Sequence, residues 1–328
     1  MQLLVTGGLG FIGSNFILNT LEKYPKTKII NLDARFIGSN PHNLYETKNY
    51  KNYHFVKGNI TNKILTEKLV KKIDIVVNFA AETHVDRSIN NPEPFFKSNF
   101  LGVYAILEAI RKYKKKLVQI STDEVYGSLK SGSANEKFPL NPSNPYAASK
   151  GSAELLIQSY VKTYDCDVNI TRCTNNYGLR QSLEKLIPKT IILAEKNRKI
   201  PVYGSGKNVR DWIYVIDHCN AITKVMFDGK RGESYNISAS NELDNITIIS
   251  KILDLMGKSL ELIEHTEDRP GHDYRYSLDS TKIFKELKFK PKHDFEKRLS
   301  ETIIWYRENK NWMKGTLKLL KSYKWRNR

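Results

Sequence analysis

The chain has 328 residues, of which 40% are hydrophobic and 27% are charged, and its formal net charge is +18 at pH 7. This composition is ordinary for a soluble globular protein of one large domain or two smaller ones. No apolar run approaches the ~20 residues that a membrane-spanning helix needs, and the opening MQLLVTGG reads as a strand, not a signal peptide. The three cysteines lack metal-ligand spacing, so we expect a reducing cytoplasm, no disulfide framework and no metal.

The positive charge allows three interpretations: a nucleic-acid binder, a site for an anionic small molecule, or a lysine-rich surface without a specific partner. The lysines are spread along the chain in short clusters such as 114–116. The sequence contains no nucleic-acid-binding motif. We therefore favour the lysine-rich surface and expect no nucleic-acid partner.

A buried strand is predicted at residues 2–6, followed by Gly7, Gly10 and Gly13 and by a helical pattern that runs to Pro25. Small residues let such a turn approach a pyrophosphate, whose charge is favoured by the helix N-terminus. The arrangement indicates a dinucleotide site, and the alternative is an ordinary tight turn.

A second strand at residues 28–32 ends at Asp33, twenty residues after Gly13. An acid at this place accepts hydrogen bonds from both ribose hydroxyls and repels a 2′-phosphate, which favours NAD over NADP. The nearby Arg35 weakens this preference.

Strands and helices alternate along the first half of the chain, which predicts an α/β fold with a Rossmann-type doubly wound parallel sheet. The expected strands are 54–56, 74–79, 117–120 and 168–171, and the expected helices are 95–113 and 146–164. After Gly178 the pattern loosens, with helices expected at 183–197, 246–256 and 295–309, extended pieces at 201–204 and 210–215, and a return to the sheet at 233–237. We predict that residues 1–174 and about 210–238 form the dinucleotide-binding domain, and that 175–209 and 239–328 form a smaller α/β lobe for a second, anionic ligand.

The stretch from 117 to 150 carries most of the candidate chemistry. A strand leads into the sequence STDEVYG at 121–127, and a helical pattern then places Tyr146 and Lys150 on one face, four residues apart. A phenol is a poor base at neutral pH, but a nearby ammonium and a nicotinamide cation favour the phenolate. The pair alone is common in helices; together with the glycine-rich turn it resembles the extended short-chain dehydrogenase/reductase family.

Asp123 and Glu124 narrow the choice of reaction to an elimination. Elimination of water needs one group that removes a carbon-bound proton and another that protonates the departing hydroxyl, whereas an alcohol dehydrogenase or epimerase needs no such pair. Adjacent strand residues face opposite ways, but a turn at the strand end brings both toward one substrate. The alternative is one solvated acid and one structural acid.

Nearly the whole chain resembles the dTDP-glucose 4,6-dehydratases. The motifs that carry the resemblance are TGGLGFIGS (6–14), AAETHVDRSI (80–89), STDEVYG (121–127), PYAASK (145–150), NNYG (175–178), EKLIP (184–188), PVYG (201–204), RDWIYV (210–215), YNI (235–237) and DRPGHDYRY (268–276). The resemblance implies a hydro-lyase that oxidises C4 of dTDP-glucose, eliminates water across C5 and C6, and returns the hydride to C6. The product is dTDP-4-keto-6-deoxyglucose, a precursor in deoxysugar biosynthesis such as that of rhamnose.

The same resemblance implies roles for individual residues. Tyr146 removes the proton of the 4-hydroxyl, Thr122 orients that hydroxyl, and Lys150 supports the pair and the nicotinamide ribose. Glu124 removes the C5 proton, and Asp123 protonates the departing C6 hydroxyl. The implied NAD contacts are Gly7, Gly10, Phe11, Ile12, Gly13, Asp33, Asn59, Ile60, Ala80, Ala81, Ser98, Tyr146, Lys150 and Asn176. The implied sugar-nucleotide contacts are Thr83, Thr122, Asn175, Lys185, Leu186, Pro201, Tyr203, Arg210, Asn236, Asp268, Arg269 and His272. Arg210 is expected to hold the diphosphate, and the alternative is an ion pair with Asp211.

The chain departs from the family pattern at three places: Asn59, where the family has an acid; Phe36 and Ile37, where it has Thr-Tyr; and residues 179–183, where it has Pro-Tyr-x-x-Pro. The last segment is expected beside the sugar nucleotide, so the base or sugar preference is open. Rival interpretations are a UDP-glucose 4,6-dehydratase, a 4-epimerase and a non-catalytic NAD-binding regulator. The family also implies a homodimer, in which helices that start near Phe95 and Tyr146 form a four-helix bundle.

Overall fold

A computed structural model describes residues 1–268 and 270–322. Its centre is a seven-stranded sheet of strand order β10-β6-β5-β4-β1-β2-β3, and every neighbouring pair is parallel. The strands are β1 (Gln2–Thr6), β2 (Lys28–Asp33), β3 (Tyr53–Lys57), β4 (Ile75–Asn78), β5 (Lys116–Thr122), β6 (Val168–Cys173) and β10 (Ser234–Ile237). The predicted doubly wound parallel sheet is confirmed, including the return of residues 233–237 to its edge.

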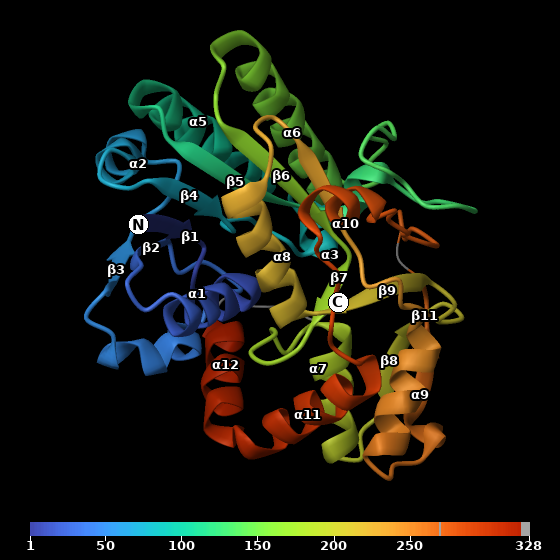
Figure 1. Ribbon diagram of the computed structural model, residues 1–328. Coiled ribbons are helices and arrows are strands. Elements are labelled where there is room, and N and C mark those ends of the chain that lie inside the picture. Colours follow the sequence, from blue (N-terminus) through green and yellow to red (C-terminus); the bar gives the residue numbers. More distant parts are fainter. Residues whose placement is uncertain (269, 323–328) are drawn as a thin grey trace.

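Helices cover both faces of this sheet (Figure 1). On one face lie α2 (Lys63–Val70), α5 (Gly102–Tyr113) and α6 (Pro145–Tyr164), and on the other lie α1 (Phe11–Lys23) and α8 (Val215–Asp228). Their inward side chains are aliphatic, as in the α5 series Val103, Ile106, Leu107 and Ile110, which is at most 1% exposed. Burial of such helical stripes against a sheet is the main stabilisation of the fold.

The strand order reverses beside β1. The chain runs outward through β2 and β3 on one side and through β4, β5 and β6 on the other. In open α/β sheets, a crevice forms at the carboxyl ends of the strands at such a reversal. The fold therefore places a ligand site beyond the ends of β1 and β4.

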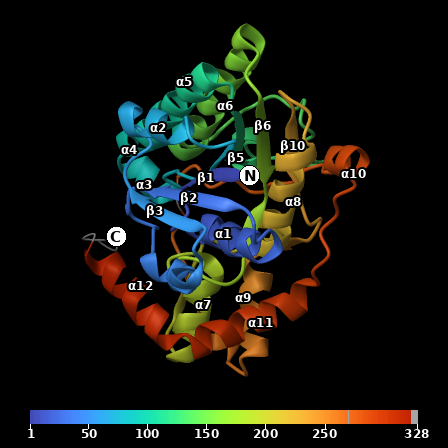
Figure 2. The same ribbon diagram turned by 60° about the vertical axis from the view of Figure 1, so that its left-hand side comes forward.

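The remaining strands form two small sheets at the carboxyl end of the large one. One contains β7 (Asn175–Tyr177), β9 (Val209–Tyr214) and β11 (Glu242–Asp244), and the other pairs β8 (Ile200–Tyr203) with β12 (Ile263–Thr266). The helices in this part of the chain are α7 (Leu186–Glu195), α9 (Asn245–Leu255), α10 (Thr281–Leu287), α11 (Phe295–Glu308) and α12 (Lys310–Ser322). Figure 2 shows α7, α9, α11 and α12 gathered below the large sheet.

Two predicted helices differ in detail. The helix expected from 95 to 113 is continuous from Glu93, but it consists of α4 (Glu93–Phe95), a π-helical segment η2 (Phe96–Leu101) and α5. The helix expected from 183 begins only at Leu186, because Lys185 has an extended backbone as its N-cap. The short elements are α3 (Val85–Asn90) and the 3₁₀ turns η1 (Pro41–Asn49), η3 (Asp123–Tyr126) and η4 (Leu260–Leu262). Within the described ranges, none of these helices is long and apolar enough to span a membrane.

Candidate active site

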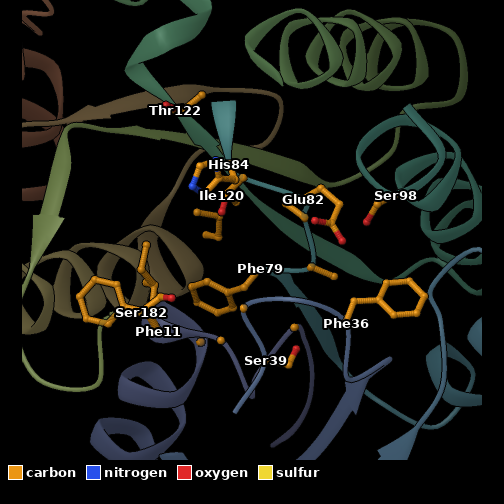
Figure 3. Close-up of a pocket in the computed structure, with 18 of the residues that line it drawn as sticks. Phe11, Phe36, Ser39, Phe79, Glu82, His84, Ser98, Ile120, Thr122 and Ser182 are labelled. Atoms are coloured by element: carbon orange, nitrogen blue, oxygen red, sulfur yellow. The ribbon is translucent and has the colours of Figure 1, made fainter. Parts of the chain in front are cut away.

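A cavity of about 320 Å³ opens at the carboxyl ends of the central strands. Its wall comes from the glycine-rich turn, the ends of β2, β4 and β5, the start of α6 and the segment after β6. Figure 3 shows Thr122 and His84 on one side of this cavity and Phe36 and Ser39 on the opposite side. The cavity therefore lies where the reversal of strand order predicts it.

The glycine-rich turn has no room for side chains. A Cβ atom on Gly7 would lie 2.6 Å from the backbone nitrogen of Ala80, and one on Gly13 would lie 2.6 Å from the carbonyl oxygen of Gly7. Gly7 also has φ +69°, a conformation that suits glycine. The bare turn and the N-terminus of α1 suit the close approach of a pyrophosphate, so the sequence and the geometry agree on a dinucleotide site.

Asp33 ends β2 with its carboxylate at the cavity wall. Its oxygens accept hydrogen bonds from the backbone nitrogens of Leu9 (3.0 Å) and Arg35 (2.7 Å) and from the Ser39 hydroxyl (2.7 Å). Burial raises the pKa of Asp33, and these hydrogen bonds oppose the rise. The carboxylate is thus held in one orientation at the cavity wall.

Thr122, Asp123 and Glu124 share a sharp turn from β5 into η3. Thr122 Oγ1 donates to Asp123 Oδ1 at 3.1 Å and accepts from the Glu124 backbone nitrogen at 3.3 Å. The Glu124 carboxylate accepts from Asn144 Nδ2 at 3.3 Å. Burial, and next the neighbouring Glu124 charge, raise the pKa of Asp123 to about 8. The Asp123 carboxyl group therefore holds a proton at neutral pH, and the adjacent Glu124 carboxylate contacts Asn144.

Tyr146 and Lys150 lie in the first two turns of α6, which begins sharply because the Asn144 side chain caps it and Pro145 occupies its first position. Burial, and next the charge of Glu124, raise the pKa of Tyr146, whereas a hydrogen bond to Thr122 lowers it. Lys150 Nζ donates to the Ile120 carbonyl at 2.6 Å, and burial lowers its pKa to about 8. The phenol, the ammonium and the acidic turn therefore line one end of the cavity.

Arg210, at the start of β9, is 5% exposed. Its guanidinium donates to the carbonyls of Val209, Asp273 and Tyr274 and stacks 4.2 Å over the Tyr276 ring. Its charge lowers the pKa of Asp123, so it lies within electrostatic reach of the acidic turn. Asp211 instead accepts hydrogen bonds from the segment 238–241 on the other side of the strand, which excludes the Arg210–Asp211 ion pair.

Most of the predicted site residues line this one cavity. They are Gly7, Gly10, Phe11, Ile12, Gly13, Asp33, Asn59, Ile60, Ala80, Ala81, Thr83, Ser98, Thr122, Asp123, Glu124, Tyr146, Lys150, Asn175, Asn176 and Lys185. The structure thus brings together residues that are far apart in the sequence.

Other predicted substrate residues lie elsewhere. Pro201 and Tyr203 are on β8, and the Tyr203 ring meets that of His272 edge-on at 6.2 Å, while His272 Nδ1 lies 2.6 Å from Asp268 Oδ1. Leu186 begins α7 and packs against the core. Arg269 lies outside the described residues.

Asn236 is fully buried on β10, away from the cavity. Its Nδ2 atom donates to the Ala134 carbonyl at 2.8 Å, and its Oδ1 accepts from the Tyr126 hydroxyl at 3.0 Å. Because both ends of the amide are already bonded inside the core, we leave Asn236 out of the substrate site.

Several residues that line the cavity are not among the predicted ones: Ser39, Glu82, Arg87, Cys173, Thr174, Gln181, Ser182, Glu184 and His218. Arg87 and Glu184 form an ion pair of 2.5 Å across the cavity wall. The signal for both was present, because they lie within the AAETHVDRSI and EKLIP motifs. His218 and Ser39 carried no local signal, since only the packing of α8 and of the loop after β2 brings them to the cavity.

The three departures from the family pattern have clear places. Asn59 lines the cavity, and its Oδ1 accepts from the Thr61 backbone nitrogen at 3.0 Å. Phe36 and Ile37 also line it. Gln181 and Ser182 contribute to the wall, whereas Arg180 turns outward to pair with Glu46 at 2.7 Å.

Comparison with known proteins agrees with this geometry. The family model described as GDP-mannose 4,6 dehydratase matches residues 4–302. A dTDP-glucose 4,6-dehydratase of Streptomyces niveus is 44% identical over 95% of this chain and 94% of its own length. The solved structure of the dTDP-glucose 4,6-dehydratase DesIV of Streptomyces venezuelae, with NAD bound, has a TM-score of 0.93 and 42% identity over 95% of this chain and 98% of that one. The Bacillus anthracis dTDP-glucose 4,6-dehydratase, in complex with NAD, has a TM-score of 0.91 and 45% identity over 96% and 99%. The chain therefore belongs to the GDP-mannose 4,6-dehydratase family, and the three relatives described above are dTDP-glucose 4,6-dehydratases.

Proposed function

We propose that this protein is an NAD-dependent dTDP-glucose 4,6-dehydratase, which converts dTDP-glucose to dTDP-4-keto-6-deoxyglucose and water. One observation carries the proposal: the Thr122-Asp123-Glu124 turn lies in the same cavity as Tyr146, Lys150 and the glycine-rich turn. This combination supplies an oxidation site and an elimination site to one substrate. The Streptomyces niveus, Streptomyces venezuelae and Bacillus anthracis relatives, at 42–45% identity, bear this activity in their names.

The residues present fit NAD. The turn at Gly7, Gly10 and Gly13 leaves space for a pyrophosphate that a Cβ atom would fill, and Asp33 suits an unphosphorylated adenosine ribose. We assign the further contacts to Phe11, Ile12, Asn59, Ile60, Ala80, Ala81, Ser98, Tyr146, Lys150 and Asn176, which line the same cavity. When bound, NAD would supply the hydride acceptor for C4 of the glucose and the hydride donor for C6.

Tyr146 is the proposed base for the 4-hydroxyl. Burial raises the pKa of Tyr146 and so favours the protonated phenol. The Thr122 hydrogen bond and a bound positive charge lower this pKa, and both are needed to make Tyr146 a base. Lys150 contributes a donor that is already oriented by the Ile120 carbonyl. Thr122 lowers the pKa of Tyr146 and donates to Asp123, so we assign the oxidation and elimination groups to the same end of the sugar.

Asp123 and Glu124 are the proposed acid and base of the elimination. A ketone at C4 makes the C5 proton labile enough for a carboxylate, which is the role of Glu124. Hydroxide is a poor leaving group, and Asp123 retains its proton at neutral pH to protonate it. Adjacent strand residues would face opposite ways, but the chain turns into η3 at Asp123, and both Asp123 and Glu124 line the cavity, which supports a shared substrate.

We assign the nucleotide sugar to the open end of the cavity, near Thr83, Asn175 and Lys185. Arg210 uses three of its five guanidinium N–H donors on backbone carbonyls of the described residues, and we assign the other two to the diphosphate. Pro201, Tyr203, Asp268 and His272 form a second group that we assign to the nucleotide. The proposed division is thus an NAD domain of residues 1–174 and about 210–238 and a sugar-nucleotide lobe of 175–209 and 239–328.

We also propose a cytoplasmic homodimer. Phe96, Leu101 and Leu155 are 39%, 48% and 58% exposed on the neighbouring helical segments η2–α5 and α6, and such apolar exposure suits a four-helix bundle between two copies. Light scattering tests this: wild type is expected at twice the chain mass, and Leu155→Glu is expected to shift it toward the monomer. A wild-type monomer would overturn the dimer. The three buried, free cysteines support a reducing compartment.

The rival substrates and reactions are separated by product mass. Purified protein is incubated with dTDP-glucose or with UDP-glucose, with NAD supplied, and the products are weighed by mass spectrometry. Loss of one water from dTDP-glucose, faster than from UDP-glucose, is the expected result. A product of unchanged mass would support a 4-epimerase instead. A preference for UDP-glucose would change the assigned nucleobase of the substrate from thymine to uracil.

A further inference from the structure

The C-terminal helix α12 (Lys310–Ser322) lies against the loop that follows β2, next to the glycine-rich turn. Figures 1 and 2 both show α12 beside α1 and the segment that contains η1. The match to the family model ends at residue 302, before this helix begins. The proposed reaction gives α12 no role, yet its contacts reach the wall of the NAD cavity through two buried asparagines.

Asn43 is the first of these bridges, and it is 2% exposed. Its Nδ2 atom donates to the Leu9 carbonyl at 3.0 Å, and its Oδ1 accepts from Trp312 Nε1 at 2.8 Å. One amide therefore joins the indole of α12 directly to a peptide of the glycine-rich turn.

Asn40 is the second bridge, and it is 5% exposed. Its backbone nitrogen donates to the same Leu9 carbonyl at 2.9 Å, and its Nδ2 donates to Thr316 Oγ1 at 2.7 Å. Thr316 is itself buried one helical turn beyond Trp312. The two asparagines that contact α12 thus both donate to one carbonyl oxygen, that of Leu9.

Leu9 also contacts Asp33, which lines the cavity. Its nitrogen donates to Asp33 Oδ2, while Ser39, the residue before Asn40, donates to Asp33 Oδ1. The links run from α12 through Asn40 and Asn43 to Leu9 and then to Asp33. Because buried polar groups are costly without partners, removal of one link leaves the others incompletely bonded and their positions less defined.

The segment 179–183, which departs from the family pattern, contacts η1 and α11. Arg180 pairs with Glu46 of η1 and lies 5.9 Å from the Trp305 ring, and the Tyr306 hydroxyl donates to the Gln181 carbonyl at 2.7 Å. Gln181 lines the cavity. Helices α11 and α12 therefore contact the cavity wall or the residues behind it at two places.

We propose that α12 is a positioning element of the NAD site, in which Trp312 and Thr316, through Asn43 and Asn40, hold the glycine-rich turn and Asp33 in the geometry that retains the dinucleotide. This inference rests on the proposed NAD-dependent function. Binding linkage is reciprocal, so docking of α12 tightens NAD binding, and bound NAD in turn favours the docked state of α12.

The test uses the purified holoenzyme and measures exchange of bound NAD for isotope-labelled NAD. Thr316→Val removes the hydroxyl at nearly constant shape, and Thr316→Ser restores it. Trp312→Phe removes the indole N–H, and Asn311→Ala is the matched control, since Asn311 is exposed on the same helix. We expect Thr316→Val and Trp312→Phe to exchange NAD at least about fivefold faster, and Thr316→Ser and Asn311→Ala to stay within about twofold of wild type.

A second readout separates positioning from simple stability. Hydrogen exchange of residues 310–320 is measured with and without saturating NAD, and wild type is expected to gain protection that Thr316→Val loses. Two results would overturn the inference while leaving the proposed function intact. One is a rate of NAD exchange in Thr316→Val equal to that of wild type, and the other is hydrogen-exchange protection of α12 that does not change when NAD binds. Failure of the wild-type protein to bind NAD at all would overturn both.

Discussion

Thr122 donates its hydroxyl proton to Asp123 Oδ1 at 3.1 Å, and the other oxygen of that carboxyl, Oδ2, is buried without a hydrogen-bond partner among the described residues. An ionised carboxylate in such a place is unfavourable, which is why the pKa of Asp123 rises to about 8. The unpartnered oxygen is a suitable place for a proton that awaits a leaving hydroxyl. A protonated Asp123 agrees with its proposed role as the acid of the elimination.

The pH dependence of the reaction follows from Asp123 and Lys150. Asp123 keeps its proton below about pH 8, and Lys150 keeps its charge below about pH 8. Above that pH the acid is ionised and the ammonium is neutral, so kcat/KM is expected to fall as pH rises through about 8. A profile of kcat/KM against pH checks this, and a rate that increases steadily through pH 9 would contradict it.

Asp123→Asn removes the proton donor but keeps the shape and the contact to Thr122. We expect kcat to fall by about 10²–10⁴, the usual contribution of a positioned acid or base, while NAD content stays near that of wild type. Turnover of dTDP-glucose and the NAD bound per chain are measured on the same preparation. Near-normal turnover in Asp123→Asn would exclude Asp123 as the acid.

Glu124→Gln tests the other half of the pair. Without a base, the C5 proton stays in place, so deuterium from D₂O is not incorporated at C5 and kcat falls by a similar ~10²–10⁴. Asn144→Ala is an informative partner, because it removes only the 3.3 Å hydrogen bond to the Glu124 carboxylate and the cap of α6. If Glu124→Gln still exchanged C5 with solvent, another base would have to be sought.

The glycine-rich turn gives a matched pair of glycine substitutions. Gly7→Ala places a Cβ atom 2.6 Å from the Ala80 nitrogen at φ +69°, so it is expected to lower the free energy of unfolding by at least about 2 kcal/mol and to abolish NAD binding. Gly151→Ala, in the middle of α6, meets its nearest atom only at 3.8 Å. That change is expected to stabilise the protein by up to about 1 kcal/mol. Thermal or urea unfolding measures both, and equal effects would refute the geometry described for the turn.

Stability away from the site is expected to depend on the buried pair Arg172 and Glu154, whose side chains are 2% and 1% exposed and 2.6 Å apart. Glu154→Gln leaves a buried guanidinium without its counter-charge and is expected to cost about 3–5 kcal/mol. The exposed pair Lys224–Asp228 is the control, since Asp228→Asn is expected to cost at most about 1 kcal/mol. Urea unfolding of both variants at pH 7 decides whether burial sets this difference.

The sequence predicted those parts of the site whose signals are local. Glycine spacing identified the turn at Gly7–Gly13, strand periodicity placed Asp33 at a strand end, and the four-residue interval put Tyr146 and Lys150 on one helix face. The bonds from Asn43 to Trp312 and from Asn40 to Thr316 join residues 269 and 276 positions apart, and no local pattern encodes such contacts. Asn236 differs: its motif suggested a substrate contact, whereas its buried side chain on β10 bonds to Ala134 and Tyr126 and does not line the cavity.

The most direct test of the central claim is the mass spectrum of the product formed from dTDP-glucose in D₂O. The dehydratase mechanism predicts the loss of one water and the gain of one deuterium at C5, with both changes absent from the Tyr146→Phe variant. A nucleotide sugar that keeps its mass in the presence of NAD, or that loses water without taking up deuterium, would contradict the assignment of Asp123, Glu124 and Tyr146.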